Sequence, residues 1–226
     1  MAVHERAPSA DLASFVDAYW WSDSFAAARI IPDGCADVIF DGGGGAMVVG
    51  TMTRPLDTSA EPGMFGIRFR PGRAAIALGT PMTEVTDLRV PLRDLTKHFP
   101  AHDPDRIETV EAALRKLFAD SKPDRRVDAA VEAIIRTSGR ATIDRVAAAA
   151  GVSRQHLARA FAYHVGVSPK TFARVMRFRR ALASAGSQQW ADLAAELGYF
   201  DQSHLIADFR EFAGTTPVPF FLSREE

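Results

Sequence analysis

Apolar and polar positions follow the same order twice in the C-terminal half of this 226-residue chain. In each copy a short apolar stretch ends at a glycine, a residue with a side-chain oxygen follows, and a leucine and a phenylalanine stand at positions i and i+4. The matching positions are Gly151 and Gly198, Ser153 and Asp201, Leu157 and Leu205, Phe161 and Phe209, Gly166 and Gly214, and Pro169 and Pro217. The repeat runs from Val146 to Pro217 with a period of about 48 residues, which indicates a duplicated supersecondary unit.

Each copy predicts a helix-turn-helix. The glycine supplies the left-handed residue that ends a first helix, and Ser153 or Asp201 supplies the N-cap of a second helix. Because Leu157 and Phe161 share one side of that helix, it has one buried stripe and one free face. DNA-binding proteins place such a free face in the major groove. A plain helical array is the alternative for a single copy, and two matched copies count against it.

Another helix is predicted between the two units, from Pro169 to Ala185. Proline is tolerated in the first turn of a helix because its missing N–H needs no partner there. At 1.5 Å per residue the helix is about 25 Å long, whereas recognition helices in successive major-groove segments stand about 34 Å apart. The helix and its flanking units can therefore set that separation. The apolar residues expected to anchor it are Phe172, Val175, Met176 and Phe178.

The first half of the chain predicts an antiparallel sheet that curls into a small barrel or half-barrel. Short apolar runs, broken by Pro-Asp-Gly and glycine-rich turn signals, are typical of its strands. They cover residues 29–31, 36–40, 46–49 and 64–70. Ahead of them, residues 8–25 predict a short capped helix that continues into an aromatic strand. In the last run Phe65, Ile67 and Phe69 alternate with Gly or Arg, which gives that strand one apolar face.

Helical spacing returns after the sheet. It predicts a short helix at 73–78, a proline-punctuated return at 81–95, and amphipathic helices at 105–118 and 125–136. A Lys-Pro-Asp sequence at 122–124 separates the last two. The expected fold class is therefore α+β, with two domains. Residues 1–120 form a sheet-rich domain with flanking helices for sensing or dimerisation, and residues 123–226 form an all-α domain of two helix-turn-helix units joined by a long central helix.

Charge is unevenly distributed along this nearly neutral chain. Residues 1–120 hold 12 Lys and Arg against 17 Asp and Glu, whereas residues 121–226 hold 15 against 11. No acidic residue occurs from Arg145 to Ala191. The cations in that stretch are Arg145, Arg154, Arg159, Lys170, Arg174, Arg177, Arg179 and Arg180. A cationic run without counter-charges favours contact with a polyanion.

Signals for other classes of protein are weak. A single cysteine excludes an internal disulfide and fits a reducing cytoplasm. The N-terminus lacks a signal-peptide core, and no run reaches the roughly 18–20 apolar residues that cross a bilayer, so we expect a cytoplasmic protein without a membrane partner. His4, His98 and His102 lack metal-ligand spacing, and the glycines 42–45 read as a hairpin loop because no Gly-Lys-Ser/Thr follows. We expect no metal, no cofactor and no enzymatic activity.

Cys35 leaves an alternative open. In that alternative the chain is a redox- or alkylation-responsive protein, or a ligand-binding enzyme that uses Cys35 or the N-terminal domain, and the basic domain only brings it to DNA. Such an enzyme requires a reactive constellation within residues 1–100, and none is visible. A small buried residue is the plainer interpretation of Cys35.

Several motifs in the C-terminal half occur in order at fixed spacing. They are Ala147, Gly151-Val-Ser153, Leu157, Phe161, Gly166-Val-Ser-Pro169, Arg177, Ala181, Ala194, Gly198-Tyr-Phe-Asp-Gln-Ser-His204, Phe209 and Gly214-Thr-Thr-Pro217. With these motifs the segment from about Val127 to Phe220 resembles the DNA-binding domain of the AraC/XylS family of bacterial transcriptional regulators. Through Tyr19-Trp20, Ile31-Pro-Asp-Gly-Cys35 and Phe69-Arg-Pro-Gly72, the N-terminal part resembles a poorly characterised sensor-like domain found ahead of such domains.

The resemblance implies two recognition helices that contact base edges. The groove-facing positions of the family fall on Arg154, Gln155, Ala158 and Arg159 in the first helix, and on Gln202, Ser203, His204 and Ala207 in the second. Arginine can pair with guanine and glutamine with adenine. Alanine offers only a methyl group, so the second helix is expected to read fewer bases and to serve more for positioning.

Phosphate contacts are expected from four cations near these helices. They are Lys170, Arg174, Arg177 and Arg145. An internal ion pair with Asp192 or Glu196 is an equal alternative for Arg177. His156 and His204 occupy matching positions of the repeat, which favours a structural or phosphate-binding role over catalysis.

The sequence thus predicts a one-component transcriptional regulator that binds two adjacent major-groove segments of double-stranded DNA. The candidates for a pocket that holds an unknown small-molecule effector are Trp20, Trp21, Arg68 and Arg70, with core packing and surface charge as the alternatives. Dimerisation of two copies through the N-terminal domain is the other expected means of control. RNA polymerase is the expected partner if the protein is an activator.

Overall fold

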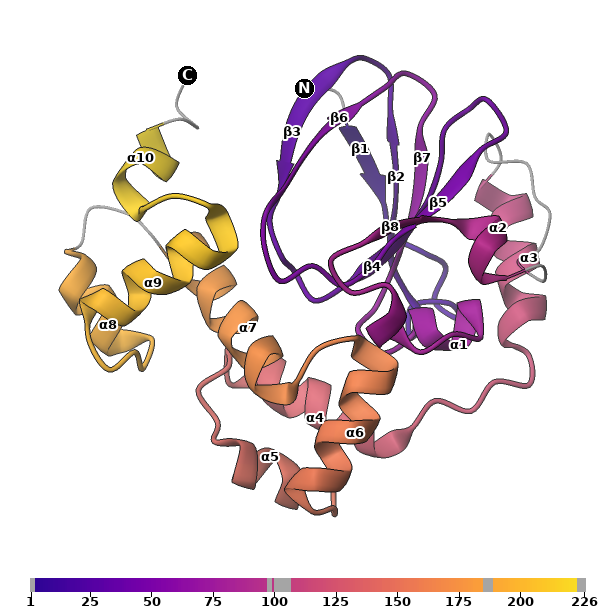
Figure 1. The fold of residues 1–226 in the computed structure, drawn as a ribbon. Coiled ribbons are helices and arrows are strands. Elements are labelled where there is room, and N and C mark those ends of the chain that lie inside the picture. The colour runs from indigo at the N-terminus through magenta and orange to yellow at the C-terminus, as the bar shows by residue number, and fades with distance from the viewer. Residues whose placement is uncertain (1–2, 97–98, 100–106, 185–188, 223–226) are drawn as a thin grey trace.

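A computed structural model describes residues 3–96, 99, 107–184 and 189–222. An antiparallel sheet forms the N-terminal part of the molecule, and helices form the C-terminal part (Figure 1). The predicted α+β fold class is therefore confirmed. His98 and His102 lie outside the described residues.

Six strands form the main sheet, in the order β1-β2-β7-β4-β5-β8, and each neighbouring pair is antiparallel. Their bounds are Val3–Arg6 for β1, Val16–Ser22 for β2, Ala36–Phe40 for β4, Ala46–Val49 for β5, Phe65–Phe69 for β7 and Arg89–Pro91 for β8. Strand β7 pairs with both β2 and β4. Its Phe65, Ile67 and Phe69 side chains are almost fully buried, as their alternation predicted.

A separate two-stranded ribbon, β3 (Ala26–Ile30) and β6 (Leu56–Ala60), stands on the side of the sheet nearer the C-terminal helices (Figure 1). Between β4 and β5 the glycines 42–45 form a hairpin loop. The Asp41 carboxylate accepts hydrogen bonds from two backbone N–H groups of that loop, so the hairpin interpretation is confirmed.

Short helices close the other side of the sheet. They are α1 (Ala74–Leu78), the 3-10 turn η1 (Met82–Glu84), α2 (Leu92–Leu95) and α3 (Ile107–Phe118). The helix predicted near residue 8 is wrong: Ser9 to Phe15 form turns, with the Leu12 N–H bonded to the Ser9 carbonyl. The strand already begins at Val16, opposite Phe69, and the Phe15 carbonyl accepts the Arg70 N–H, so this carbonyl bonds to the chain beyond β7 and not to a helix.

The C-terminal part contains both predicted helix-turn-helix units. Its helices are α4 (Arg125–Arg136), α5 (Ile143–Ala149), α6 (Arg154–Val165), α7 (Pro169–Ser184), α8 (Trp190–Glu196), α9 (Gln202–Ala213) and α10 (Pro217–Leu222). The side chains of Ser153 and Asp201 cap α6 and α9 by accepting the backbone N–H of the third residue beyond each. Gly166 and Gly214 end the same helices in the left-handed region.

Two hydrophobic cores hold the units, and α7 contributes to both. Phe172 packs with Leu157 and Phe161 in the first core, whereas Phe178 packs with Leu205 and Phe209 in the second. The central helix therefore joins the two units rigidly, one end in each core (Figure 1).

Candidate nucleic-acid interface and ligand cleft

The free face of α6 carries the residues predicted to read bases. Arg154, Gln155, Ala158 and Arg159 are exposed, while the opposite stripe of Leu157, Phe161 and Val165 is buried. Arg154 makes a loose ion pair of 3.4 Å with Asp144 of α5, and both side chains remain about two-thirds exposed. The face is thus formed and accessible, with its polar atoms available to a partner.

The corresponding face of α9 is also exposed at Gln202, Ser203, His204 and Ala207. The His204 ring lies 3.1 Å from the Asp201 N-cap carboxylate. That contact ties one polar group of this face to the helix start, so α9 presents fewer free hydrogen-bonding groups than α6.

Phe200 is a residue of this face that the sequence prediction left out. Its side chain is 90% exposed, although its neighbour Tyr199 is buried. The ring stands edge-on to the His204 ring at 5.7 Å, directly before the N-cap of α9. The signal was present in the sequence, because the second copy has a Tyr-Phe pair where the first copy has one residue fewer.

A groove of about 620 Å³ lies between the two units. Its lining includes Arg140, Thr142, Lys170, Arg177, Phe200 and His204. Lys170 also borders the exposed face of α6. The side chains of Lys170 and Arg145 are exposed and form no ion pair with another described residue, which leaves both free for an anion.

Arg174 does not lie as the phosphate expectation requires. Its guanidinium contacts Asp208 at 2.6 Å and Glu211 at 2.5 Å and covers the Phe212 ring at 5.0 Å. The hydrogen bonds that Arg174 donates to Glu211 and Asp208 raise the pKa of Arg174. Burial raises the pKa of Asp208, and the bond from Arg174 opposes that shift. Because Asp208 and Glu211 belong to α9, Arg174 links α7 to α9, and its charge is already matched by these two carboxylates.

Arg177 is also held inside the domain. It donates a hydrogen bond of 2.7 Å to the Gly139 carbonyl and stacks over the Tyr199 ring at 5.2 Å. No ion pair joins it to Asp192 or Glu196 among the described residues. It therefore connects the end of α4 in the first unit to the turn of the second, which neither predicted role included.

The N-terminal part docks on the C-terminal end of α6. The Thr51 hydroxyl donates a buried hydrogen bond of 2.6 Å to the Val165 carbonyl, and the Thr86 hydroxyl donates one of 2.7 Å to the Gly166 carbonyl. Arg73 forms an ion pair of 2.6 Å with Asp128 of α4. The two threonine contacts lie at the end of α6 opposite Arg154, and the ion pair is with α4, so these contacts leave the exposed face of α6 open.

The β3–β6 ribbon reaches the second unit. Arg29 is held by Asp57 at 2.6 Å and donates a longer bond of 3.4 Å to the Ala213 carbonyl at the end of α9. Ile31 packs on the core of the second unit. Just beyond the ribbon, Gly34 faces Phe172 of α7 so closely that a Cβ would overlap the ring. The N-terminal part thus touches both helix-turn-helix units.

A cleft opens between the ribbon and the main sheet. Its inner cavity, of about 250 Å³, is lined by Trp20 and Arg68, two of the four candidates for an effector pocket. Trp21 lines a different hollow and stacks on His4, and Arg70 is exposed and lines none of the described cavities. The structure therefore does not bring these two candidates together with Trp20 and Arg68, because Trp21 alternates with Trp20 onto the other face of β2 and Arg70 lies beyond the end of β7.

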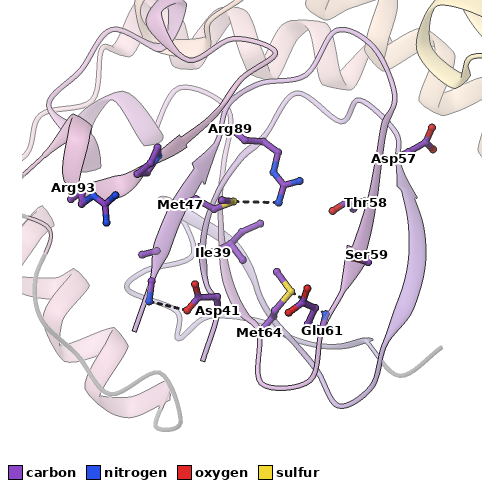
Figure 2. Close-up of a pocket in the computed structure, with 13 residues that line it drawn as sticks. Ile39, Asp41, Met47, Asp57, Thr58, Ser59, Glu61, Met64, Arg89 and Arg93 are labelled. Carbon is purple, nitrogen blue, oxygen red and sulfur yellow. Dashed lines mark hydrogen bonds between the residues drawn. The ribbon is translucent and has the colours of Figure 1, made fainter. Parts of the chain in front are cut away.

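Arg89 is a lining residue that the sequence prediction missed. It borders both the inner cavity and an outer cleft of about 700 Å³. Figure 2 shows its guanidinium pointing into the space between Met47 and Thr58, above Ile39 and Met64. The sequence predicts a proline-punctuated return for 81–95 and no strand there. Strand β8 has only 3 residues, too few to show an alternating pattern, so the sequence does not indicate that the exposed Arg89 side chain borders the cleft.

Cys35 is half-buried and lies beside the half-buried carboxylates of Asp33 and Asp37. Burial raises the pKa of the Cys35 thiol, and the negative charge of Asp33 adds to the shift. Burial likewise raises the pKa of Asp37 to about 6, although Arg68 opposes it. A thiol whose pKa is raised carries little of the reactive thiolate, so these surroundings count against the redox alternative.

Two features that other functions would require are absent from the described residues. Within ranges 3–96, 99, 107–184 and 189–222, no group of three or more His, Cys, Asp and Glu side chains could hold a metal ion. Within the same ranges, no helix has both the length and the apolar character needed to cross a membrane.

Comparison with known families gives two matches. Residues 146–221 match a family described as a helix-turn-helix domain, of the AraC type. Residues 4–91 match a domain of unknown function (DUF6597). No curated protein sequence matches the chain significantly.

Among solved structures, crystal structures of ToxT from Vibrio cholerae are similar at low identity. One at 1.65 Å resolution is 9% identical with a TM-score of 0.44, covering 98% of this chain and 97% of that one. Another, of ToxT bound to (E)-4-(8-methylnaphthalen-1-yl)but-3-enoic acid, is 9% identical with a TM-score of 0.43, covering 89% of this chain and 91% of that one.

Proposed function

Given that the chain carries an AraC-type helix-turn-helix domain and is a DNA-binding transcriptional regulator, we propose that α6 and α9 enter two successive major-groove segments of one duplex. The observation that supports this most is the pair of exposed helix faces, each opposite a buried stripe and both fixed to α7. At 1.5 Å per residue, α7 is about 24 Å long, so α7 and the units at its ends suit the roughly 34 Å between groove segments.

The two helices contribute differently in this proposal. Arg154, Gln155 and Arg159 of α6 have free donors and acceptors for base edges, with Ala158 between them as a small apolar contact. On α9, Gln202 and Ser203 supply fewer such groups, His204 is tied to its cap, and the ring of Phe200 is available to a thymine methyl group. Lys170 and Arg145 contact phosphates, whereas Arg174 and Arg177 hold the units together.

Selection of bound duplexes from a random pool, followed by titration, tests the proposal. We expect a selected site with two short conserved segments about one helical turn apart. The protein should bind this site much more tightly than it binds random duplex. Arg159→Ala should cost about 1–3 kcal/mol and relax preference at one base pair. Arg93→Ala, which removes an exposed arginine of the N-terminal part, is the matched control. Equal affinity for random and selected duplexes would contradict the proposal.

Control by the N-terminal part is the second element of the proposal. The ribbon lines the cleft with Leu56 and Thr58, and Arg29, which pairs with Asp57 between them, meets the end of α9. A ligand between ribbon and sheet can therefore alter the position of α9 relative to α6. We propose this route for a small-molecule effector; the described contacts favour it over control by dimerisation.

A further inference from the structure

The inner cavity of the cleft is mainly apolar. Its walls include Trp20, Ile39, Val49, Leu56 and Met64. With a volume of about 250 Å³, it is just below the usual range for drug-sized ligands, about 300–1,000 Å³. It therefore suits a small molecule with an apolar body.

The cavity has two cationic side chains, and only one is matched by carboxylates. Arg68 lies 3.1 Å from Glu5 and 3.5 Å from Asp37, with Asp33 at 3.7 Å. Arg89 forms no ion pair with any described residue, and its one hydrogen bond, of 3.3 Å, goes to the Met47 sulfur. A thioether is a weak acceptor, so the guanidinium lacks an anionic partner.

Carboxylates at the outer rim do not supply that partner. Asp57 is held by Arg29, and Asp41 by the N–H groups of its own hairpin loop. Glu61 lines the outer cleft but not the inner cavity. The inner cavity thus combines apolar walls, the polar residues Thr58 and Ser59, the ion pair of Arg68 with Glu5, and the exposed guanidinium of Arg89, which no described carboxylate matches.

We propose that the inner cavity binds a small organic carboxylate with an apolar body, whose carboxylate pairs with Arg89. A guanidinium and a carboxylate can form two parallel hydrogen bonds, and the apolar body covers Ile39, Met64 and Trp20. The inference rests on the proposed function, in which the N-terminal part senses a ligand, and it names the class of that ligand.

The test uses the full chain and a panel of paired probes. Phenylacetate, 4-isopropylbenzoate and isovalerate are compared with their neutral amides by calorimetry and by quenching of tryptophan fluorescence. We expect at least one carboxylate to bind and its amide to bind about tenfold or more weakly, because hydrogen bonds to a charged group contribute about 1.5–3 kcal/mol. Inorganic phosphate, which has no apolar body, should not compete.

Arg89→Gln should weaken the binding carboxylate about tenfold or more and leave its amide unchanged. Arg93→Gln, at the exposed outer rim, is the matched control and should bind as the wild type does. The inference is overturned if no carboxylate binds, if amides bind equally well, if phosphate competes, or if Arg89→Gln binds normally. Duplex binding measured without probe reports separately on the proposed function, because Arg89 belongs to β8 of the main sheet and not to the exposed faces of α6 and α9.

Discussion

Phe200 and Asp37 show how a single side chain acquires a role from its surroundings. A phenylalanine is ordinarily a core residue, yet Phe200 projects into water beside the cap of α9. An aspartate is ordinarily exposed and ionised, yet Asp37 lies behind the cleft, where it accepts a hydrogen bond of 2.8 Å from the Trp20 indole. Each makes a distinct prediction.

If Phe200 contacts a thymine methyl group, replacing that thymine by uracil removes the contact and nothing else. We expect one such replacement in the α9 segment to weaken wild-type binding, by about 0.8 kcal/mol for a buried methyl group, and to have no effect on Phe200→Ala. Phe25→Ala, which removes another exposed phenylalanine, should respond as the wild type does. Equal sensitivity of Phe200→Ala and wild type at every thymine would contradict the contact.

Asp37 makes the stability of the fold depend on pH. Its folded pKa of about 6 lies above the unfolded value of about 3.9. Its contribution to the free energy of unfolding is therefore fully present below about pH 4 and is lost as the pH rises through about 6. In urea unfolding, Asp37→Asn should gain about 1–3 kcal/mol relative to wild type between these limits. A difference that stays constant with pH would show that the Asp37 carboxyl is not perturbed.

At the scale of helices, the sequence predicted the features that depend on neighbouring residues and missed those that depend on contacts distant in the chain. The bounds of α4 agree with the predicted 125–136, and the caps of α6 and α9 agree because caps and apolar spacing are local properties. The partners of Arg174 stand 34 and 37 residues away. No pattern near Arg174 indicates them, which is why a phosphate role was expected for it.

Arg174 and Lys170, one turn apart on α7, should respond in opposite ways to loss of charge. Arg174→Gln leaves the buried Asp208 carboxylate without its cation, so we expect the unfolding free energy to fall by about 1–3 kcal/mol. This loss is smaller than that for a fully buried pair, because the Arg174 side chain is 31% exposed. The salt dependence of DNA binding should be the same for Arg174→Gln as for the wild type.

Lys170→Gln should leave the unfolding free energy nearly unchanged. It should reduce the slope of log affinity against log salt by about one. Chemical denaturation and salt-dependent titration of both variants make the comparison. A reduced salt slope for Arg174→Gln would restore the phosphate role that its ion pairs contradict.

For the whole molecule, the docking of sheet on helices is the feature that the sequence did not reveal. Nothing in the sequence around Thr51 or Thr86 indicates a special role. Their hydrogen-bond acceptors, Val165 and Gly166, lie 114 and 80 residues further along the chain, at the end of α6. The cleft was only partly predicted for the same reason. Strand alternation indicated Arg68, whereas Arg89 required the pairing of β5 with β8.

Thr51→Val keeps the shape of the side chain and leaves the Val165 carbonyl buried without its donor. We expect a loss of about 1–3 kcal/mol in unfolding free energy and, with Thr86→Val added, two separate unfolding transitions in calorimetry where the wild type has one. Thr83→Val, at an exposed position of η1, is the control. A single transition in the double variant would show that the two hydroxyls do not couple the parts.

Gly34 lies where the N-terminal part packs against α7. It has room only for a hydrogen where Phe172 of α7 stands against it, and Gly166 is equally confined by Thr86 and Met82. At these two positions each part constrains the backbone of the other. A chimera that joins this DNA-binding part to a foreign sensor, or this sensor to a foreign reader, would lose the fit at both glycines, so we expect the two parts to dock poorly with foreign partners.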